Sequence, residues 1–175
     1  DRPSDKLYDF VVVTENDQYA GIVTIKKMLQ KATELEVSNA RQQSPLTGLP
    51  GNLAIEQTLA SLIEEEKDFS VTYIDIDNFK AFNDVYGFEC GDLVIKLLAK
   101  ILRDHFLTNQ FIGHIGGDDF IIILDYHNAE HKFEEVVRVF EKEVLNFYSE
   151  EDREKGYITA KSRYGKIEKF PLISL

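Results

Sequence analysis

Two apolar runs that flank a pair of glycines constrain the fold of this 175-residue chain more than any other feature. The runs occupy residues 111–115 and 119–124, on either side of Gly116 and Gly117. Apolar, β-branched segments joined by a short glycine turn are typical of a β-hairpin. Because the second run is almost wholly apolar, we expect this hairpin to be buried inside the protein.

Helix and strand signals around the hairpin predict an α/β sandwich with a mixed central sheet and flanking helices. Residues 92–106 show the strongest helical periodicity, with Asp92 placed to cap the first turn, and Gly87 suits the C-cap of the helix before it. The other predicted helices span residues 53–67, 78–86 and 132–148, and the other predicted strands span residues 69–76, 157–161 and 170–175.

The N-terminal part of the chain predicts a separate region. Residues 8–14 and 19–25 are β-branched and apolar, which favours a second hairpin, and residues 26–43 favour a polar helix with a loose apolar stripe. Ser44 precedes Pro45 and therefore avoids helical backbone, which ends that helix. We expect three parts: a small regulatory piece over residues 1–30, a helical linker over residues 31–43, and a main domain over residues 44–175.

The charge of the chain restricts its partners. Acidic residues outnumber basic ones by 31 to 20, and the net charge of −11 disfavours nucleic acid and anionic lipid. A small phosphorylated ligand stays compatible if a divalent cation bridges the two negative groups. No apolar run reaches the ~18–20 residues that cross a bilayer. Cys90, the single cysteine, excludes an internal disulfide and indicates a reducing compartment.

Four aspartates lie where predicted strands meet turns. Asp75 and Asp77 share one face at the end of the predicted strand over residues 69–76, and Asp118 and Asp119 follow the glycine pair. If the hairpin packs beside that strand, Asp118 and Asp75 face each other and form an oxygen-ligand site for Mg²⁺ or Mn²⁺. Such a metal would hold a triphosphate during phosphoryl or nucleotidyl transfer. The alternative for each pair alone is an ordinary solvated turn or a strand-end cap.

Three motifs, over residues 46–52, 75–92 and 115–120, resemble the GGDEF domain of diguanylate cyclases. They read LTGLPGN, DIDNFKAFNDVYGFECGD and IGGDDF. The resemblance implies a fold like the palm of nucleotide cyclases and polymerases. It also implies an enzyme of the bacterial cytoplasm, a nucleotidyltransferase that condenses two GTP molecules into cyclic di-GMP with Mg²⁺ or Mn²⁺. Because each half-site would hold one GTP, a homodimer is implied as well.

The resemblance assigns roles to single residues. Asp75, Asp118 and Asp119 match catalytic carboxylates, and the Ile76 carbonyl joins Asp75 and Asp118 as an implied metal ligand. The implied nucleotide contacts are Asn83 and Asp92 to the guanine edge, Lys80 to phosphate, Phe79 along the pocket, and Gly116 and Gly117 where the phosphates approach the turn. Ordinary alternatives stay open, namely solvated helix positions for Lys80 and Asn83, core for Phe79 and a helix cap for Asp92.

The chain also departs from the family pattern. Asp119 stands where Glu is usual, which shortens the side chain by one methylene, while Phe88 replaces a histidine and Leu53 an arginine. Residues 107–110 lack the R-x-x-D of the family's inhibitory product site, so product feedback through that site is not expected. We expect the domain to continue past Leu175 into a strand and a helix with basic phosphate-binding residues. The alternative is a degenerate, weak or inactive domain that binds GTP or a cyclic dinucleotide as a signalling or dimerisation module.

The N-terminal piece resembles the last half of a CBS motif, a regulatory module that often binds adenine nucleotides. The resemblance covers residues 8–29 and includes the stretch GIVTIKKML. A nucleotide ligand is therefore a candidate partner of this part, and a CBS module would regulate the main domain. Thr24 matches a ribose-holding residue, but Lys27 replaces the aspartate that completes the ribose site. The alternative is a strand pair of no special kind.

Overall fold

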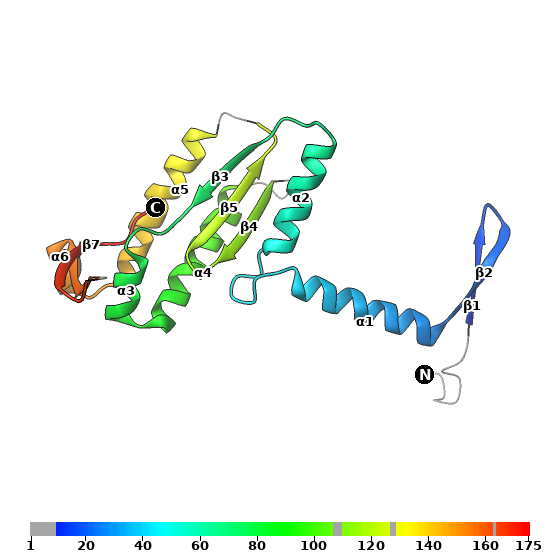
Figure 1. Ribbon diagram of the computed structural model, residues 1–175, viewed down its shortest axis with the longest axis horizontal. Helices are drawn as coiled ribbons and strands as arrows, with labels where there is room; N and C mark the ends of the chain where they lie inside the picture. The colour runs from blue at the N-terminus through cyan, green and yellow to red at the C-terminus, as the bar shows by residue number, and fades with distance from the viewer. Residues whose placement is uncertain (1–9, 107–109, 127–128, 163) are drawn as a thin grey trace. The chain divides into compact units, whose positions relative to one another are not determined.

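The structure is a computed structural model that describes residues 10–106, 110–126, 129–162 and 164–175. Predictions that fall on residues 8–9 and on most of the 107–110 window therefore lie outside the described residues. The chain divides into two compact units, residues 1–41 and residues 42–175 (Figure 1). Within the described residues, no helix is both long and apolar enough to cross a bilayer.

The first unit is a hairpin followed by a helix, which confirms both predicted elements. The antiparallel strands are β1 (Phe10–Glu15) and β2 (Gln18–Thr24), and the helix α1 (Ile25–Arg41) follows directly. The turn between the strands uses Asn16 and Asp17 at positive φ, which these residue types tolerate better than most. The apolar side chains of β1 are exposed, so the hairpin holds no core of its own.

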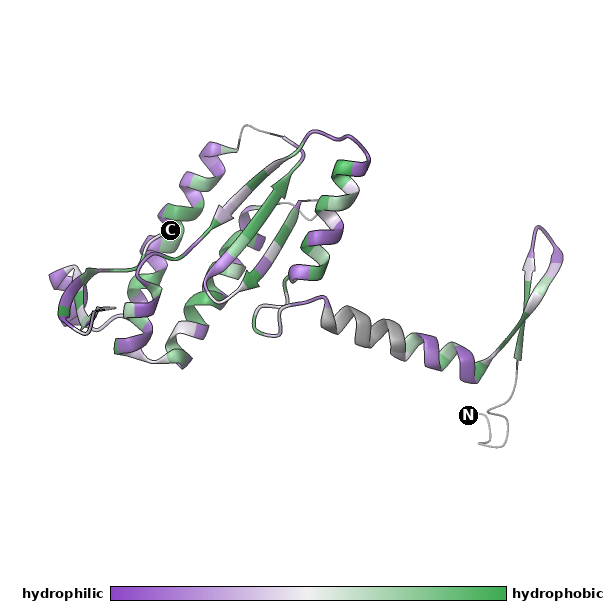
Figure 2. Ribbon diagram, in the orientation of Figure 1, coloured by the Kyte–Doolittle hydropathy of each residue, from purple (hydrophilic) through white to green (hydrophobic). Residues whose placement is uncertain are grey.

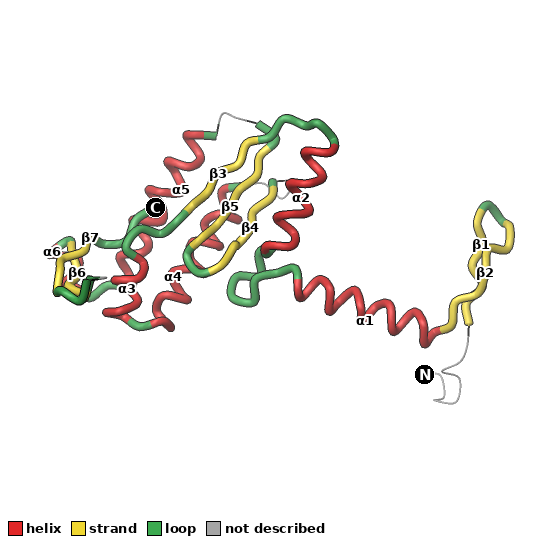
Figure 3. The backbone as a smooth tube through the Cα atoms, in the orientation of Figure 1, coloured by secondary structure: helices red, strands yellow, loops and turns green. Residues whose placement is uncertain are grey.

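The second unit contains the predicted buried hairpin, and the second strand of this hairpin is the central strand of the sheet (Figures 1 and 3). The three-stranded sheet has the order β3-β5-β4, and both pairings are antiparallel. A separate hairpin, β6-β7, follows near the C-terminus. The sheet strands are β3 (Ser70–Ile74), β4 (Phe111–Gly116) and β5 (Asp119–Leu124); the helices are α2 (Asn52–Glu64), α3 (Phe79–Tyr86), α4 (Phe88–His105), α5 (Glu130–Val144) and α6 (Glu150–Lys155), with a 3₁₀ turn η2 (Leu145–Phe147); the last hairpin is β6 (Tyr157–Lys161) and β7 (Ile167–Pro171).

Both faces of β5 are buried, as its composition predicts. Phe120, Ile122 and Leu124 join the large core with α3, α4 and α5. Ile121 and Ile123 face the other way and join a smaller cluster with Ile55 of α2. The central strands are accordingly the greenest part of Figure 2. The predicted α/β sandwich is confirmed, but the prediction of a mixed sheet was wrong, because both strand pairings of this sheet are antiparallel.

Gly113 explains how α2 lies so close to the sheet. A Cβ atom at this position would stand 2.7 Å from Cγ1 of Ile55 and 2.9 Å from Cγ2 of Ile121. Both distances are shorter than carbon atoms tolerate, so only glycine lets the helix approach here. The close contact buries the side of the hairpin that α3, α4 and α5 leave open.

Two predicted elements had wrong bounds, and one helix was missed. The helix predicted from Asp92 begins at Phe88, so Asp92 lies inside α4 and does not cap it; Gly87, with φ of 85°, stands at the cap instead and also ends α3 as predicted. The last strand is residues 167–171 rather than 170–175. The helix α6 was missed because it is short and wholly polar. Ser149 caps it by accepting a hydrogen bond from the Asp152 amide at 3.2 Å.

Candidate active site

The acidic residues converge where β3 ends and β5 begins. The antiparallel register pairs Ile74 with Phe120, so the next residues outward, Asp75 and Asp119, lie opposite each other. Partial desolvation raises the pKa of Asp75, and the charge of Asp118 and a hydrogen bond with Asp119 raise it further. The predicted neighbourhood of the two acidic pairs is therefore present in the structure.

The pairing across the strands differs in detail from the expectation. The sequence predicted Asp118 opposite Asp75, whereas the side chain of Asp75 shares its hydrogen bond with Asp119, which accepts it when Asp75 is protonated. The reason is the length of the turn. Gly116 pairs with Asp119 across the hairpin, which leaves Gly117 and Asp118 as the two loop residues. Asp118 therefore lies on the turn and acts on Asp75 through its charge.

The glycine turn is open on its outer side. Gly117 has a φ of 61°, a backbone conformation that residues with a Cβ atom rarely adopt. The φ of the next residue, Asp118, is not positive. A positive φ at only the first loop residue is the pattern of a II′ turn, which selects glycine there. No atom lies within 4 Å of where a Cβ of Gly116 or Gly117 would stand. The turn therefore leaves room for a ligand beside its backbone.

Oxygen donors suited to a hard cation gather at this place. No group of three or more His, Cys, Asp or Glu side chains in the described residues is arranged to hold a metal by itself. Mg²⁺ does not need such a group, because it commonly takes one or two carboxylates and completes its shell with water and phosphate oxygens. The Ile76 carbonyl accepts only a 3.3 Å hydrogen bond from the Phe79 amide, which leaves a lone pair available. The donor set thus fits a site shared with a phosphorylated ligand.

The loop from β3 into α3 is fixed at both ends. The Asp77 amide donates a 2.9 Å hydrogen bond to the Ser174 carbonyl, so the C-terminal segment holds the loop in place. Asn78 follows with φ of 61° and turns the chain into α3. This arrangement sets the direction of the helix that carries Phe79, Lys80 and Asn83.

Asn83 has an unused acceptor. Its Oδ1 atom is buried and has no hydrogen-bond partner, which is costly for a polar group unless something donates to it. The amide lies against the start of α4, because a Cβ atom on Gly91 would stand 1.9 Å from Asn83 Oδ1. Asp92 is the next residue and is exposed. The structure therefore places Asn83 beside Gly91, the neighbour of Asp92, and the guanine-reading role of Asn83 and Asp92 stays a prediction.

The other predicted nucleotide contacts differ in their surroundings. Phe79 is 7% exposed and belongs to the core, where it stacks on Phe82 with 6.5 Å between ring centroids. Lys80 is exposed and pairs with Asp84 at 2.8 Å on the same helix. It also lines a cavity of about 740 Å³ between α3 and the β6–β7 hairpin, opposite Lys161 and Ser162. The sequence did not predict this cavity, because the strand that forms part of its wall was predicted over residues 170–175.

Tyr73 is a site neighbour that sequence reasoning missed. Its hydroxyl donates a hydrogen bond to Asp119, which raises the pKa of Tyr73 to about 12. The signal was present in the sequence, because alternation along β3 places Tyr73 on the same face as Asp75. The hydroxyl therefore holds one of the three carboxylates in place.

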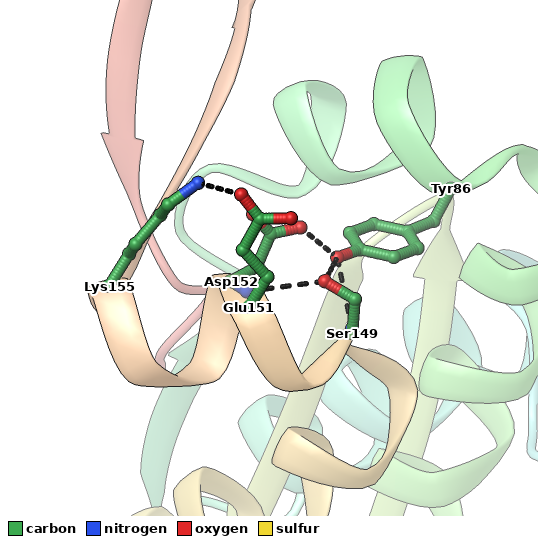
Figure 4. A network of polar contacts seen from close by, with 5 residues as sticks. All are labelled: Tyr86, Ser149, Glu151, Asp152 and Lys155. Atoms are coloured by element: carbon green, nitrogen blue, oxygen red, sulfur yellow. Dashed lines mark hydrogen bonds and ion pairs between the residues drawn. The ribbon is translucent and has the colours of Figure 1, made fainter.

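A polar network anchors the far end of α3 (Figure 4). The Tyr86 hydroxyl donates to the Asp152 carboxylate and accepts from the Ser149 amide at 3.2 Å. The Tyr86 ring also meets the buried Tyr148 ring edge-on at 5.3 Å. Together with the loop contact at Asp77, this network fixes both ends of the helix that carries Asn83.

Comparison with known families supports the sequence resemblance. Residues 41–162 match the family described as "Diguanylate cyclase, GGDEF domain". Diguanylate cyclase DgcP of Pseudomonas aeruginosa is 36% identical over 107 residues, which are 57% of this chain and 16% of DgcP. Diguanylate cyclase VdcA of Vibrio cholerae is 30% identical over 155 residues, 79% of this chain and 44% of VdcA. The chain thus spans less than half the length of these relatives.

Solved structures show the same fold. The coiled coil and GGDEF domain of DgcB from Caulobacter crescentus, in complex with c-di-GMP, superposes with a TM-score of 0.59 at 24% identity, over 85% of this chain and 73% of that one. Diguanylate cyclase SiaD from Pseudomonas aeruginosa, in complex with its activator SiaC, gives 0.55 at 24% identity, over 65% of this chain and 46% of SiaD. At this identity the likeness concerns the fold.

Proposed function

The chain belongs to the GGDEF domain family of diguanylate cyclases, and from this premise we propose that it condenses two molecules of GTP into cyclic di-GMP. The observation that carries the proposal is the convergence of Asp75, Asp118 and Asp119 beside an open glycine turn. Carboxylates crowded together without a cation repel one another, so the arrangement is best explained by a charged ligand that neutralises it. The relatives are bacterial, and GTP is a cytoplasmic substrate, so we place this activity in the bacterial cytoplasm.

The guanine base would bind between α3 and the start of α4. The buried Asn83 Oδ1 is an acceptor without a donor, and the N1–H and N2–H groups of guanine are donors. The exposed Asp92 carboxylate would accept from the same edge of the base. Lys80 would leave Asp84, with which it makes only an exposed ion pair, and contact the phosphates.

Asp75, Asp118 and the Ile76 carbonyl would hold Mg²⁺ or Mn²⁺. When bound, the metal supplies positive charge that stabilises the phosphates during transfer. In the reaction the 3′-oxygen of one GTP bonds to the α-phosphorus of the other, and pyrophosphate leaves. Asp119 would take the proton of the attacking hydroxyl, and the Tyr73 hydroxyl would orient this carboxylate.

Turnover requires two copies of the chain, because each would present one GTP. We therefore propose a homodimer in which α1 links the protomers. The first unit would act as a CBS-like regulatory piece with a nucleotide as a candidate ligand. Its hairpin has exposed apolar strands and gains stability by packing against further structure.

A second function is favoured by one observation. Asp119 is a methylene shorter than the glutamate usual at this position, and a misplacement of ~1 Å costs ~100-fold in a positioned site. The chain would then bind GTP or a cyclic dinucleotide and signal without making product.

Incubation with GTP and Mg²⁺, followed by chromatography, separates the two functions. We expect a peak of cyclic di-GMP together with pyrophosphate. Binding of GTP without any product would favour the signalling function instead. The reaction without Mg²⁺ is the control, and it should form no product.

Gly91→Ala should weaken GTP binding with little effect on folding. The new methyl group would stand 1.9 Å from Asn83 Oδ1 and 3.1 Å from Phe79 Cζ, so the Asn83 amide must swing away. Alanine favours a helix over glycine by ~1 kcal/mol, which offsets part of this strain. We expect GTP affinity to fall by about 10-fold or more in calorimetric titration. Leu93→Ala, an exposed position in the same helix, should bind GTP normally; equal affinity in both variants would remove Asn83 from the guanine site.

A further inference from the structure

The polar residues buried in the second unit lie together behind the glycine turn. Thr47 is 8% exposed and His114 is 4% exposed, and they are the buried polar side chains of the described residues. Buried polar groups persist where hydrogen bonds compensate the loss of water. Sequence reasoning gave neither residue a role, although His114 stands four residues before Asp118.

His114 uses both ring nitrogens. Nε2 lies 2.9 Å from the Gly117 carbonyl oxygen, and Nδ1 lies 2.7 Å from Ser44 Oγ and 3.1 Å from Thr47 Oγ1. A carbonyl oxygen only accepts, so Nε2 must carry the proton. In the neutral ring, Nδ1 then accepts from the hydroxyls. The imidazole therefore joins the loop of residues 44–49 to the turn that bears Asp118.

The hydrogen bond from His114 to the Gly117 carbonyl orients the whole peptide group between Gly117 and Asp118. A peptide group is planar, so holding the Gly117 carbonyl also sets the direction of the Asp118 amide. Gly117 has no side chain and can rotate freely, so the turn needs such a restraint from outside. No atom on the outer side of the turn provides it, because space there is open. The restraint thus comes from the buried side, through His114.

Packing holds the imidazole itself. The ring stacks on Phe120 with 4.6 Å between centroids and an interplanar angle of 12°. Phe120 is fully buried and follows Asp119 directly. His114 is therefore clamped by the core on one face and by three hydrogen-bond partners at its edges.

We propose that His114 is a positioning residue that sets the turn geometry of Asp118 and Asp119 for catalysis. The proposal rests on the proposed cyclase function and assigns this residue an effect on the reaction rather than on substrate affinity. Removing the restraint should displace the carboxylates while leaving the guanine site between α3 and α4 intact.

The test compares His114→Phe with His114→Gln. Phenylalanine keeps a ring against Phe120 but loses every hydrogen bond, whereas the glutamine amide can still donate to the Gly117 carbonyl. We expect His114→Phe to lower kcat by ~100-fold with KM for GTP within ~3-fold, and His114→Gln to recover at least ~10-fold of the loss. Phe140→Leu, a core change in α5, is the matched control: it should lower the melting temperature without lowering kcat. A kcat for His114→Phe within ~3-fold of the unchanged protein would overturn the proposal.

A measurement without GTP or metal separates this inference from the proposed function. Long-range ¹H–¹⁵N correlation of the His114 ring identifies which nitrogen is protonated, and we expect the Nε2–H form. The backbone amide signals of Gly117 and Asp118 should shift in His114→Phe and less in His114→Gln, because the peptide between them loses its restraint. An Nδ1–H ring, or unchanged amide signals in His114→Phe, would overturn the positioning role even in an active enzyme. Absence of product from the unchanged protein, with the expected ring and amide results, would instead contradict the cyclase function alone.

Discussion

Asp75→Asn should lower the rate of GTP turnover by about 1,000-fold and, without metal, raise the melting temperature. The activity falls because the variant loses a charged metal ligand, and single electrostatic contacts at a reacting centre contribute ~100- to 1,000-fold. The melting temperature rises because the asparagine no longer repels Asp118, Asp119 and Asp77. Relief of exposed charges is worth at most ~1 kcal/mol, or about 2–4 °C in a domain of this size.

The same carboxylate predicts how stability depends on pH. The pKa of Asp75 is raised in the folded protein, so the unfolded chain releases this proton at lower pH. Stability is therefore lost as the pH rises from the ordinary aspartate pKa through the raised value, and it is not regained at higher pH. Thermal melts without metal should show this loss, and Asp75→Asn should show less of it.

Asp125→Asn is the matched control, because this exposed aspartate follows β5 at the opposite end of the strand. It should keep turnover and leave the melting temperature within a degree or so of the original value. Normal turnover by Asp75→Asn would remove Asp75 from the catalytic site. An unchanged melting temperature would show that the acidic residues do not repel one another as the structure indicates.

Phe82→Ala should give the largest loss of stability. Phe82 is completely buried, stacks on Tyr86 at 5.0 Å and meets Tyr148 edge-on at 5.1 Å. Truncating a buried phenylalanine costs ~3–5 kcal/mol, because it removes apolar contact and leaves a cavity. Since Phe82 anchors α3, we expect GTP binding to weaken in the same variant. Denaturant unfolding of the intact protein measures the first effect directly.

Val85→Ala provides the comparison for Phe82. Val85 lies on the same helix but is 42% exposed, so its truncation should change the free energy of unfolding by no more than ~0.5 kcal/mol. Similar losses in both variants would mean that α3 is not held by the aromatic cluster around Phe82.

The burial of the hairpin could be predicted from the sequence, because apolar composition specifies burial strongly. Ile121, Ile122 and Ile123 are buried on the two faces of β5. The place of the hairpin beside β3 was only a condition of the predicted site, and the structure meets this condition. The pairing of β5 with β3 brings the two acidic pairs together at the ends of these strands.

The finer pairing could not be predicted, since it depends on one residue in the turn. A two-residue loop leaves Asp118 on the turn and puts Asp119 into the ladder opposite Asp75, and a shift of the register by one residue would change which side chain faces Asp75. The roles of Tyr73 and His114 depend on side-chain contacts between segments far apart in the chain. Residue type and spacing give no direct measure of such contacts.

Helix boundaries failed for a local reason. Asp92 is a good cap residue, but α4 begins four residues earlier, after Gly87 in a conformation that favours glycine. The contact between Gly91 and Asn83 favours a helix that begins at Phe88, because it packs the first turn of α4 against α3. Cap preferences of ~1 kcal/mol are easily outweighed by such packing.

A crystal structure with Mn²⁺ and a non-reactive GTP analogue, with the metal located by anomalous scattering, tests the proposed site most directly. We expect a peak about 2 Å from carboxylate oxygens of Asp75 and Asp118, with the phosphates beside Gly116 and Gly117 and the base at Asn83. A peak elsewhere, or a bound analogue whose phosphates lie away from the glycine turn, would contradict the proposed site.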